Sequence, residues 1–403
     1  WRFMVENNTQ LKEMIRSMVI DVLQGQKQET ASSQPVKQVS RVQEPGVFDT
    51  VDEAIRAAKE AQLRFEDCTL ATREKVIADI RAAMRPRVQE LAQKTVEETG
   101  MGRVADKVLK LNLTLDKTPG VEDLVTECET GDNGMTLYEL SAYGVIGAIT
   151  PSTNPAETLI CNSIGMLAAG NAIFFSVHPG AKNLSRELVS ELNQVIAKSI
   201  GIENLIVTLR EPSIESAQEM MLHPDVSLLV VTGGPGVVKQ ALQSGKKVIG
   251  AGAGNPPAIV DETADIKKAA QDIVLGASLD NNILCIAEKS VVAMRQIEPQ
   301  LVQEMVKVGC VLVDNQQDIQ RLVDLTVLPN GTPNKQFVGK NASVILDAAH
   351  IPYNGDPRLI ILRTPKDHPF AVIEMLMPIL PVVTVDSFEE GLDVCLMLEA
   401  GLH

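Results

Sequence analysis

Two kinds of hydrophobic pattern divide this chain of 403 residues. In the first part apolar residues recur at the spacing of helix turns, and from Tyr143 onward short continuous apolar runs alternate with such helical patterns. Alternating strands and helices are typical of a parallel sheet with helices on its faces, so the pattern predicts a doubly wound α/β fold. A second series begins after residue 253, and we place a domain boundary near residue 252.

The runs and periodic segments give the elements of both series. In the first series we expect strands at residues 143–150, 171–177, 204–209, 226–234 and 246–254, and helices at 157–169, 184–201, 213–223 and 235–245. In the second we expect strands at 256–261 and 289–294, and helices at 266–280 and 297–309.

Helical patterns also precede the first of these strands. Residues 50–65 and 72–100 have apolar residues at helical spacing, and Gly100 and Gly102 provide a stop signal after the second run. Within residues 125–144 the sequence Asp-Asn-Gly separates two runs with high strand propensity, which predicts a β-hairpin.

The first 46 residues have a character of their own. Apolar positions between residues 11 and 23 fall on one face of a helix, so we expect an amphipathic helix within residues 1–24. Residues 25–46 are polar and contain two prolines, a composition typical of a flexible linker. A short helix on a tether either docks onto another protein or packs back onto its own domain, and the pattern leaves both readings open.

Composition narrows the class of protein. The formal net charge of −15 argues against a nucleic-acid partner, which would require a basic face. Six scattered cysteines without a CxxC pair and five histidines without HExxH spacing favour a reduced, cytoplasmic protein and give no zinc-site pattern. No run approaches the roughly 20 apolar residues of a membrane-spanning helix, and the N-terminus lacks a signal peptide's apolar core.

Glycines at one predicted strand end suit a phosphate group. Thr232, Gly233 and Gly234 lie between a strand and a helix, where backbone amides at a helix N-terminus favour an anion. No GxGxxG follows the first strand of this region, so the usual dinucleotide fingerprint is missing. Glycines required by a tight turn are the alternative interpretation.

A second loop follows the strand that ends near residue 150. Pro151 and Pro155 stiffen it, and Ser152, Thr153 and Asn154 lie at the carboxyl end of a strand, where ligands bind in open α/β sheets. Asn154 suits two roles, a helix N-cap or an amide donor to a ligand. Cys285 in "DNNILCIAEK" is likewise either a buried apolar residue or a nucleophile.

Six segments together resemble the aldehyde dehydrogenase superfamily, and more closely its coenzyme A-acylating branch, the acetaldehyde and propionaldehyde dehydrogenases of bacterial microcompartments. The resemblance extends in order from about residue 50 to the end of the chain. It rests on "ITPSTNPAET", "FFSVHPGAK", "VVTGGPGVVKQA", "GAGAGNPPAIVD", "DNNILCIAEK" and "EMLMPILPVV".

The resemblance implies a domain organisation. We expect two doubly wound Rossmann-type domains, with residues 47–252 binding the cofactor and residues 253–403 forming the catalytic domain. A hairpin at 122–144 would cross between the subunits of a homo-oligomer, a dimer or tetramer. The family's catalytic domain continues beyond the position of residue 403, so the resemblance also implies a further C-terminal segment.

The resemblance also implies an oxidoreductase chemistry. Cys285 would be the nucleophile that adds to an aldehyde, and the resulting thiohemiacetal would pass hydride to NAD and leave a thioester. The Asn154 amide and the Cys285 backbone N–H would stabilise the oxyanion. The cofactor-binding positions carried over from the family are Thr150, Pro151, Ser152, Thr153, His178, Pro179, Gly180, Thr232, Gly233, Gly234, Gly250, Ala251, Gly252 and Glu374.

Two departures from the wider superfamily bear on the substrates. Gly250 stands where hydrolytic members have a glutamate base, so a thiol, coenzyme A, becomes the expected acyl acceptor, although Glu288 is an alternative base. The segment from His178 to Ala181 replaces a Lys-Pro-x-Glu motif whose acid holds the ribose. Without that acid, NADP as well as NAD remains a possible cofactor, and coenzyme A could use the same nucleotide cleft.

Further implications concern location and rivals. The N-terminal helix would bind microcompartment shell or cargo proteins through residues 8–24, which places the protein inside a cytoplasmic microcompartment. Propionaldehyde and acetaldehyde differ by one methylene, worth only about 1 to 3 kcal/mol, and both stay open. An acyl-phosphate reductase on the same fold and a catalytically silent scaffold are the rival readings.

Overall fold

The computed structural model describes residues 44–401. The helix predicted within residues 1–24 and the linker up to residue 43 therefore lie outside the described residues. The predicted linker extends three residues too far, because Glu44 is already tied to the folded part. Its carboxylate accepts a hydrogen bond from Arg210 at 2.7 Å and pairs with Arg186 at 3.3 Å.

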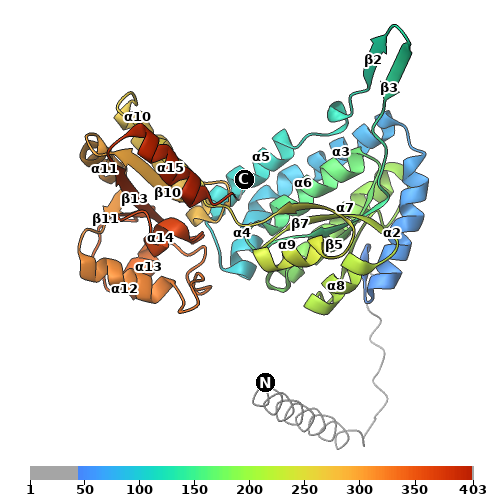
Figure 1. The fold of residues 1–403 in the computed structure, drawn as a ribbon. Helices are drawn as coiled ribbons and strands as arrows, with labels where there is room; N and C mark the ends of the chain where they lie inside the picture. Colours follow the sequence, from blue (N-terminus) through green and yellow to red (C-terminus); the bar gives the residue numbers. More distant parts are fainter. Residues whose placement is uncertain (1–43, 402–403) are drawn as a thin grey trace, which may run out of the picture. The chain divides into compact units, whose positions relative to one another are not determined.

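A six-stranded parallel sheet forms the first part of the fold. Its strand order is β1-β6-β5-β4-β7-β8. The strands are β1 (Val47–Phe48), β4 (Val145–Ile149), β5 (Ala172–Ser176), β6 (Ile206–Leu209), β7 (Val226–Thr232) and β8 (Lys247–Ala251). Every residue of β4, β5 and β6 is buried, because helices cover both faces of the sheet (Figure 1).

The helices around this sheet follow the predicted segments closely. One pair packs against the central strands and a second pair carries an outer layer of three helices. The first pair is α2 (Val51–Glu66) and α8 (Ile214–Leu222), the second α6 (Pro155–Ala168) and α7 (Lys182–Ile200), and the outer layer α3 (Leu70–Met84), α4 (Val88–Thr99) and α5 (Val104–Lys117). The helix α9 (Pro235–Leu242) packs on β7 and β8.

The prediction of one helical run over residues 72–100 was wrong in its middle. A 3-10 turn, η1 (Arg85–Arg87), separates α3 from α4. Pro86 lies in this turn, and a proline inside a helix has no N–H to donate and its ring crowds the preceding turn. The predicted stop is confirmed, because Gly100 has a left-handed φ of 66° and caps α4 with a bond to the Val96 carbonyl.

The predicted hairpin is confirmed. Antiparallel strands β2 (Glu127–Gly131) and β3 (Gly134–Tyr138) flank the turn residues Asp132 and Asn133. All ten strand residues are exposed, including the apolar side chains of Met135 and Leu137. Its assignment to subunit contacts remains a prediction.

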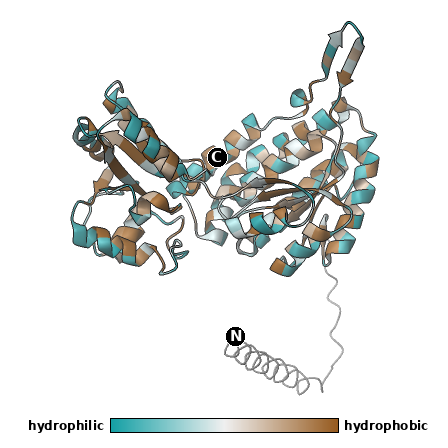
Figure 2. Cartoon of the chain, in the orientation of Figure 1, coloured by the Kyte–Doolittle hydropathy of each residue, from teal (hydrophilic) through white to brown (hydrophobic). Residues whose placement is uncertain are grey.

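A second parallel sheet has the order β11-β12-β13-β10-β9. β8 is the last strand of the first sheet and β9 the first of the second, on either side of the boundary predicted near residue 252. Figure 2 shows that apolar residues concentrate on the strands of both sheets. The strands are β9 (Pro257–Val260), β10 (Ser290–Met294), β11 (Cys310–Leu312), β12 (Leu359–Arg363) and β13 (Ile379–Val385).

Helices accompany the second sheet as they do the first, which confirms an α/β fold with parallel sheets. They are α10 (Ile266–Ser278), α11 (Glu298–Lys307), α12 (Gln316–Thr326), α13 (Ala342–Ala348), α14 (Pro369–Val372) and α15 (Phe388–Glu399). Short 3-10 turns occur at η2 (Val121–Asp123), η3 (Pro179–Ala181) and η4 (Leu279–Asn282). Within residues 44–401, none of the helices has the length and apolar character needed to cross a membrane.

Candidate active site

Most predicted cofactor positions lie along one edge of the first sheet. Because its strands are parallel, the carboxyl ends of β5, β4, β7 and β8 lie side by side. The chain runs outward from β4 through β5 and β6 and then resumes on the other side at β7, so β4 and β7 flank the point where strand order reverses. Ligands of open α/β sheets bind outside this switch point. The segments there are 150–154, 178–180, 232–234 and 250–252.

Two features of this edge suit a nucleotide. The Thr150 hydroxyl is buried and has no hydrogen-bond partner among the described residues. Gly234 is the N-cap of α9, and no atom lies within 4 Å of where its Cβ would be, so a ligand can approach the backbone closely at this helix start. The residues present therefore fit a bound phosphate, as the sequence predicted for residues 232–234.

The remaining cofactor positions have defined local roles. His178 caps η3 through Nδ1, which accepts from the Gly180 N–H at 3.0 Å, and Pro179 begins that turn. The Gly233 N–H donates to the Ala251 carbonyl at 3.1 Å, which ties the loop after β7 to β8. Loop residues 151–154 are half-buried, and Gly252 follows β8 directly.

The segment before Cys285 has an unusual backbone. Asp280, Asn281 and Asn282 have successive φ values of 50°, 58° and 62°, all in the left-handed region. A non-glycine residue in this region is under strain of roughly 1 to 3 kcal/mol unless its surroundings compensate. All three side chains are buried, so the strained turn is held from within the protein.

Asn282 and Lys289 fix the two ends of the loop around Cys285. The Asn282 amide donates to the carbonyls of Ala277 and Glu288, at 2.6 and 2.9 Å. The Lys289 ammonium donates to the carbonyls of Asn282 and Leu284, at 2.9 and 2.7 Å. Cys285 itself is half-buried between these anchors.

Lys289 is nearly fully buried, and this changes its titration. Burial lowers the pKa of Lys289 to about 8, although electrostatic interactions with Glu374, Cys285 and Glu288 act in the opposite direction. Glu374, predicted to contact the nicotinamide ribose, therefore lies within electrostatic reach of the cysteine loop. The Glu288 carboxylate points at α10, where a Cβ on Gly276 would lie 2.2 Å from its Oε2.

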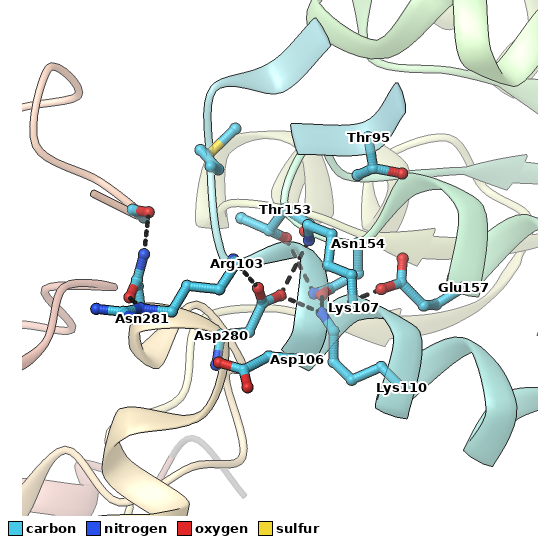
Figure 3. Close-up of polar contacts among 12 residues, drawn as sticks. Thr95, Arg103, Asp106, Lys107, Lys110, Thr153, Asn154, Glu157, Asp280 and Asn281 are labelled. Atoms are coloured by element: carbon cyan, nitrogen blue, oxygen red, sulfur yellow. Dashed lines mark hydrogen bonds and ion pairs between the residues drawn. The ribbon is translucent and has the colours of Figure 1, made fainter. Parts of the chain in front are cut away.

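The Asp280 carboxylate joins this loop to α5 (Figure 3). It is completely buried, and the ammonium groups of Lys107 and Lys110 lie 2.9 and 2.5 Å away. The Arg103 N–H also donates to it at 2.8 Å. Burial alone would raise the pKa of Asp280, but the two lysines outweigh it and hold the pKa below its usual range.

The same lysines reach the loop after β4. Lys107 Nζ donates to the Thr153 carbonyl at 3.0 Å, and Lys110 Nζ donates to Asn154 Oδ1. Asn154 occupies the N-cap position of α6, but its side chain makes no capping bond there. The N-cap interpretation is therefore correct for its position only, and the side chain is engaged in the Lys110 cluster.

The structure thus connects the two predicted catalytic residues through side chains that the sequence interpretation missed. Lys107, Lys110 and Asp106 lie on the buried face of α5 together with Leu111 and Leu115. Charged residues at core positions of an amphipathic helix were the available signal, because they require buried partners.

Comparison with known proteins decides the family. The model of the aldehyde dehydrogenase family matches residues 23–403. The chain belongs to the aldehyde dehydrogenase family. This chain is 47% identical to the propanal dehydrogenase (CoA-propanoylating) of Citrobacter freundii over 398 residues, which are 98% of this chain and 83% of that protein.

Solved structures of aldehyde dehydrogenases agree. The propionaldehyde dehydrogenase of Rhodopseudomonas palustris, solved with bound CoA and an acylated cysteine, matches with a TM-score of 0.87 and 45% identity, over 89% of this chain and 82% of that one. A propionaldehyde dehydrogenase from the Clostridium phytofermentans fucose utilisation bacterial microcompartment matches with a TM-score of 0.86 and 46% identity, over 89% and 82%. These matches confirm the predicted fold.

Replacing Gly102 by alanine tests how rigidly Asp280 is held. Gly102 and Gly201 both have left-handed φ values, +80° and +72°. A Cβ on Gly102 would lie 2.0 Å from Asp280 Oδ1, whereas nothing lies within 4 Å at Gly201. Backbone strain should cost each variant about 1 kcal/mol, and Gly102→Ala should lose roughly 2 kcal/mol more because the buried carboxylate must move.

Chemical unfolding of Gly102→Ala and Gly201→Ala measures the difference directly. Equal losses of unfolding free energy in the two variants would show that the Asp280 turn adapts without penalty.

Replacing Lys289 by methionine should remove one source of pH dependence in stability. The folded protein releases the Lys289 proton near pH 8, whereas the unfolded chain keeps it until about pH 10.5. Because the unfolded state binds more protons in this window, the parent's unfolding free energy gains a component that rises with pH there. Urea unfolding across the window should show a smaller rise for Lys289→Met. Identical pH profiles would mean that Lys289 stays charged in the fold.

Proposed function

We propose that this aldehyde dehydrogenase is a coenzyme A-acylating enzyme for a short aliphatic aldehyde. It converts propionaldehyde or acetaldehyde, coenzyme A and NAD⁺ to acyl-CoA, NADH and a proton. The main support is the loop that carries Cys285. It follows a strained turn whose side chains are buried, and Asp280 and Lys110 connect it to Asn154. The similar Rhodopseudomonas palustris enzyme carries bound CoA and an acylated cysteine.

Cys285 acts as nucleophile in this proposal. Its thiolate adds to the aldehyde carbon, and the carbonyl π pair becomes an oxyanion on a tetrahedral thiohemiacetal. Asn154 Nδ2 and the Cys285 backbone N–H supply hydrogen bonds to that oxyanion. When the oxyanion collapses, the C–H bond electrons leave as hydride and a thioester to Cys285 remains.

The sheet edge at the switch point holds the dinucleotide. When bound, NAD⁺ supplies the hydride acceptor. Residues 232–234 would hold its phosphates, residues 150–153 and 250–252 would lie beside it, and Glu374 would bind the nicotinamide ribose. At the adenosine end, residues 178–180 offer no carboxylate for the ribose. NADP therefore remains a possible cofactor, and no negative charge there would repel the phosphate of coenzyme A.

The acyl acceptor follows from the two positions that could supply a base for water, Gly250 and Glu288. Gly250 lies in β8, and a Cβ there would be 3.2 Å from Val238 Cγ1, so this position packs toward α9. Glu288, the alternative base, is turned toward Gly276 of α10. The thioester then persists until the thiolate of coenzyme A attacks it, forming acyl-CoA and releasing the Cys285 thiolate.

The proposed surroundings are a bacterial microcompartment in the cytoplasm. The Clostridium phytofermentans relative comes from such a compartment. The exposed hairpin β2–β3 would join subunits of a dimer or tetramer, and residues 8–24 would bind shell or cargo proteins.

Turnover of propionaldehyde with NAD⁺ should require coenzyme A and Cys285. NADH formation should be sustained only when coenzyme A is present, and Cys285→Ala should abolish it. Cys68→Ala, which removes another half-buried cysteine, is the matched control and should keep the parent rate. Sustained turnover without coenzyme A would support hydrolysis, turnover with phosphate would support an acyl-phosphate reductase, and indifference to Cys285→Ala would reject cysteine catalysis.

Deleting residues 4–24 should abolish co-sedimentation with co-expressed microcompartment shells and leave NADH formation unchanged. A chain whose residues 4–24 are shuffled, with the same composition but no apolar face, should behave like the deletion. Encapsulation of either variant at the parent level would reject the docking role of this segment.

A further inference from the structure

We propose that Lys110 is a positioning residue that sets the orientation of the Asn154 carboxamide. The assignment rests on the proposed function, because it takes Asn154 as a donor to the oxyanion. Lys110 Nζ donates to Asn154 Oδ1, and Asn154 Nδ2 donates to the Thr153 hydroxyl at 3.2 Å (Figure 3). The second N–H of this amide is then the one available to a ligand.

An ammonium group is well suited to this task. The two ends of a carboxamide have nearly the same shape, but one end only accepts hydrogen bonds and the other only donates. Lysine has three donors and no acceptor, so it pairs with the oxygen and opposes the NH₂ end. Lys110 therefore selects one of two amide orientations, the one that leaves Nδ2 directed away from α5.

Lys110 is itself held firmly and stays charged. It is buried on α5, with Asp280 at 2.5 Å and Glu157 at 3.2 Å. Burial alone would lower the pKa of Lys110, but the carboxylates of Glu157 and Asp280 outweigh it and raise the pKa. The Lys110 ammonium that donates to the Asn154 oxygen is thus charged across the working pH range.

The same cluster fixes the position of the Asn154 donor relative to the Cys285 nucleophile. Asp280 lies five residues before Cys285 and pairs with both lysines. Lys107 is the natural comparison, because it is also buried and shares Asp280 but donates to the Thr153 main-chain carbonyl. Lys107 holds the backbone of the loop. Among the hydrogen bonds of residues 44–401, the Asn154 side chain has only two partners, Lys110 and the neighbouring Thr153.

Loss of Lys110 should act on the chemical step. A carboxamide free to flip presents its oxygen to the oxyanion in part of the population, and one lost oxyanion donor typically lowers rate by about 10²- to 10³-fold. We expect Lys110→Met to slow hydride transfer about 10- to 100-fold. The KM for coenzyme A and the rate of Cys285 alkylation by iodoacetamide should stay near the parent values.

A double-mutant cycle on the first-turnover burst of NADH, without coenzyme A, tests this pathway. The variants are Lys110→Met, Asn154→Ala and both together, with Lys107→Met alone and combined with Asn154→Ala as the matched set. Circular dichroism and Cys285 alkylation report whether each variant keeps its fold and nucleophile. Lys110→Arg, whose side chain also only donates, should recover part of the lost rate.

If Lys110 acts through Asn154, Lys110→Met should cost little further rate once Asn154 is alanine. The Lys107→Met effect should instead multiply with Asn154→Ala. Multiplying effects for Lys110→Met, or an unchanged burst in that variant alone, would overturn the proposal. The burst precedes acyl transfer, so it tests Lys110 independently of the acyl acceptor. Sustained turnover of the parent protein without coenzyme A would reject coenzyme A as acceptor, and the cycle would still show whether Lys110 acts through Asn154. A parent with no NADH burst rejects both.

Discussion

The arrangement of the candidate active site depends on one buried carboxylate. Asp280 accepts hydrogen bonds from two buried lysines and a backbone N–H, and it belongs to the turn that leads to Cys285. Taking such charges out of water costs several kcal/mol per ion, which pairing offsets only with good geometry. Removing one partner of a buried ion pair typically costs about 3 to 5 kcal/mol, so the cluster tolerates few alternative geometries.

That intolerance explains the strained backbone next to it. Three successive left-handed residues would not persist in a freely moving loop. Gly102, whose missing side chain leaves room for the Asp280 carboxylate, and Lys289, which bonds two loop carbonyls, hold the turn from opposite ends. The strain in the turn before Cys285 is therefore balanced by specific contacts on both sides.

The fold could be predicted from the sequence wherever a local pattern determines structure. Continuous apolar runs gave the buried strands of the first sheet, Gly100 marked a helix end, and the Asp-Asn-Gly turn marked the hairpin. The break at Pro86 was missed because the apolar period continues across it, although proline's missing donor was visible. Charged residues at core positions of α5 indicated buried partners, but the pairing of Lys110 with Asp280 could not be predicted, because no local signal identifies partners so far apart in the chain.

The cluster also clarifies how a site can stabilise an oxyanion and still be slow to hydrolyse. The oxyanion requires fixed donors, and Asn154 is fixed by a cation whose own partners are buried. Hydrolysis would require a carboxylate beside the thioester, but Gly250 packs toward Val238 and Glu288 lies against α10. The buried carboxylates that do lie near the loop, Asp280 and Glu157, are paired with lysines. Rigidity and acceptor choice thus have a common origin, because Asp280 and Glu157 hold the lysines that fix the donors instead of activating water.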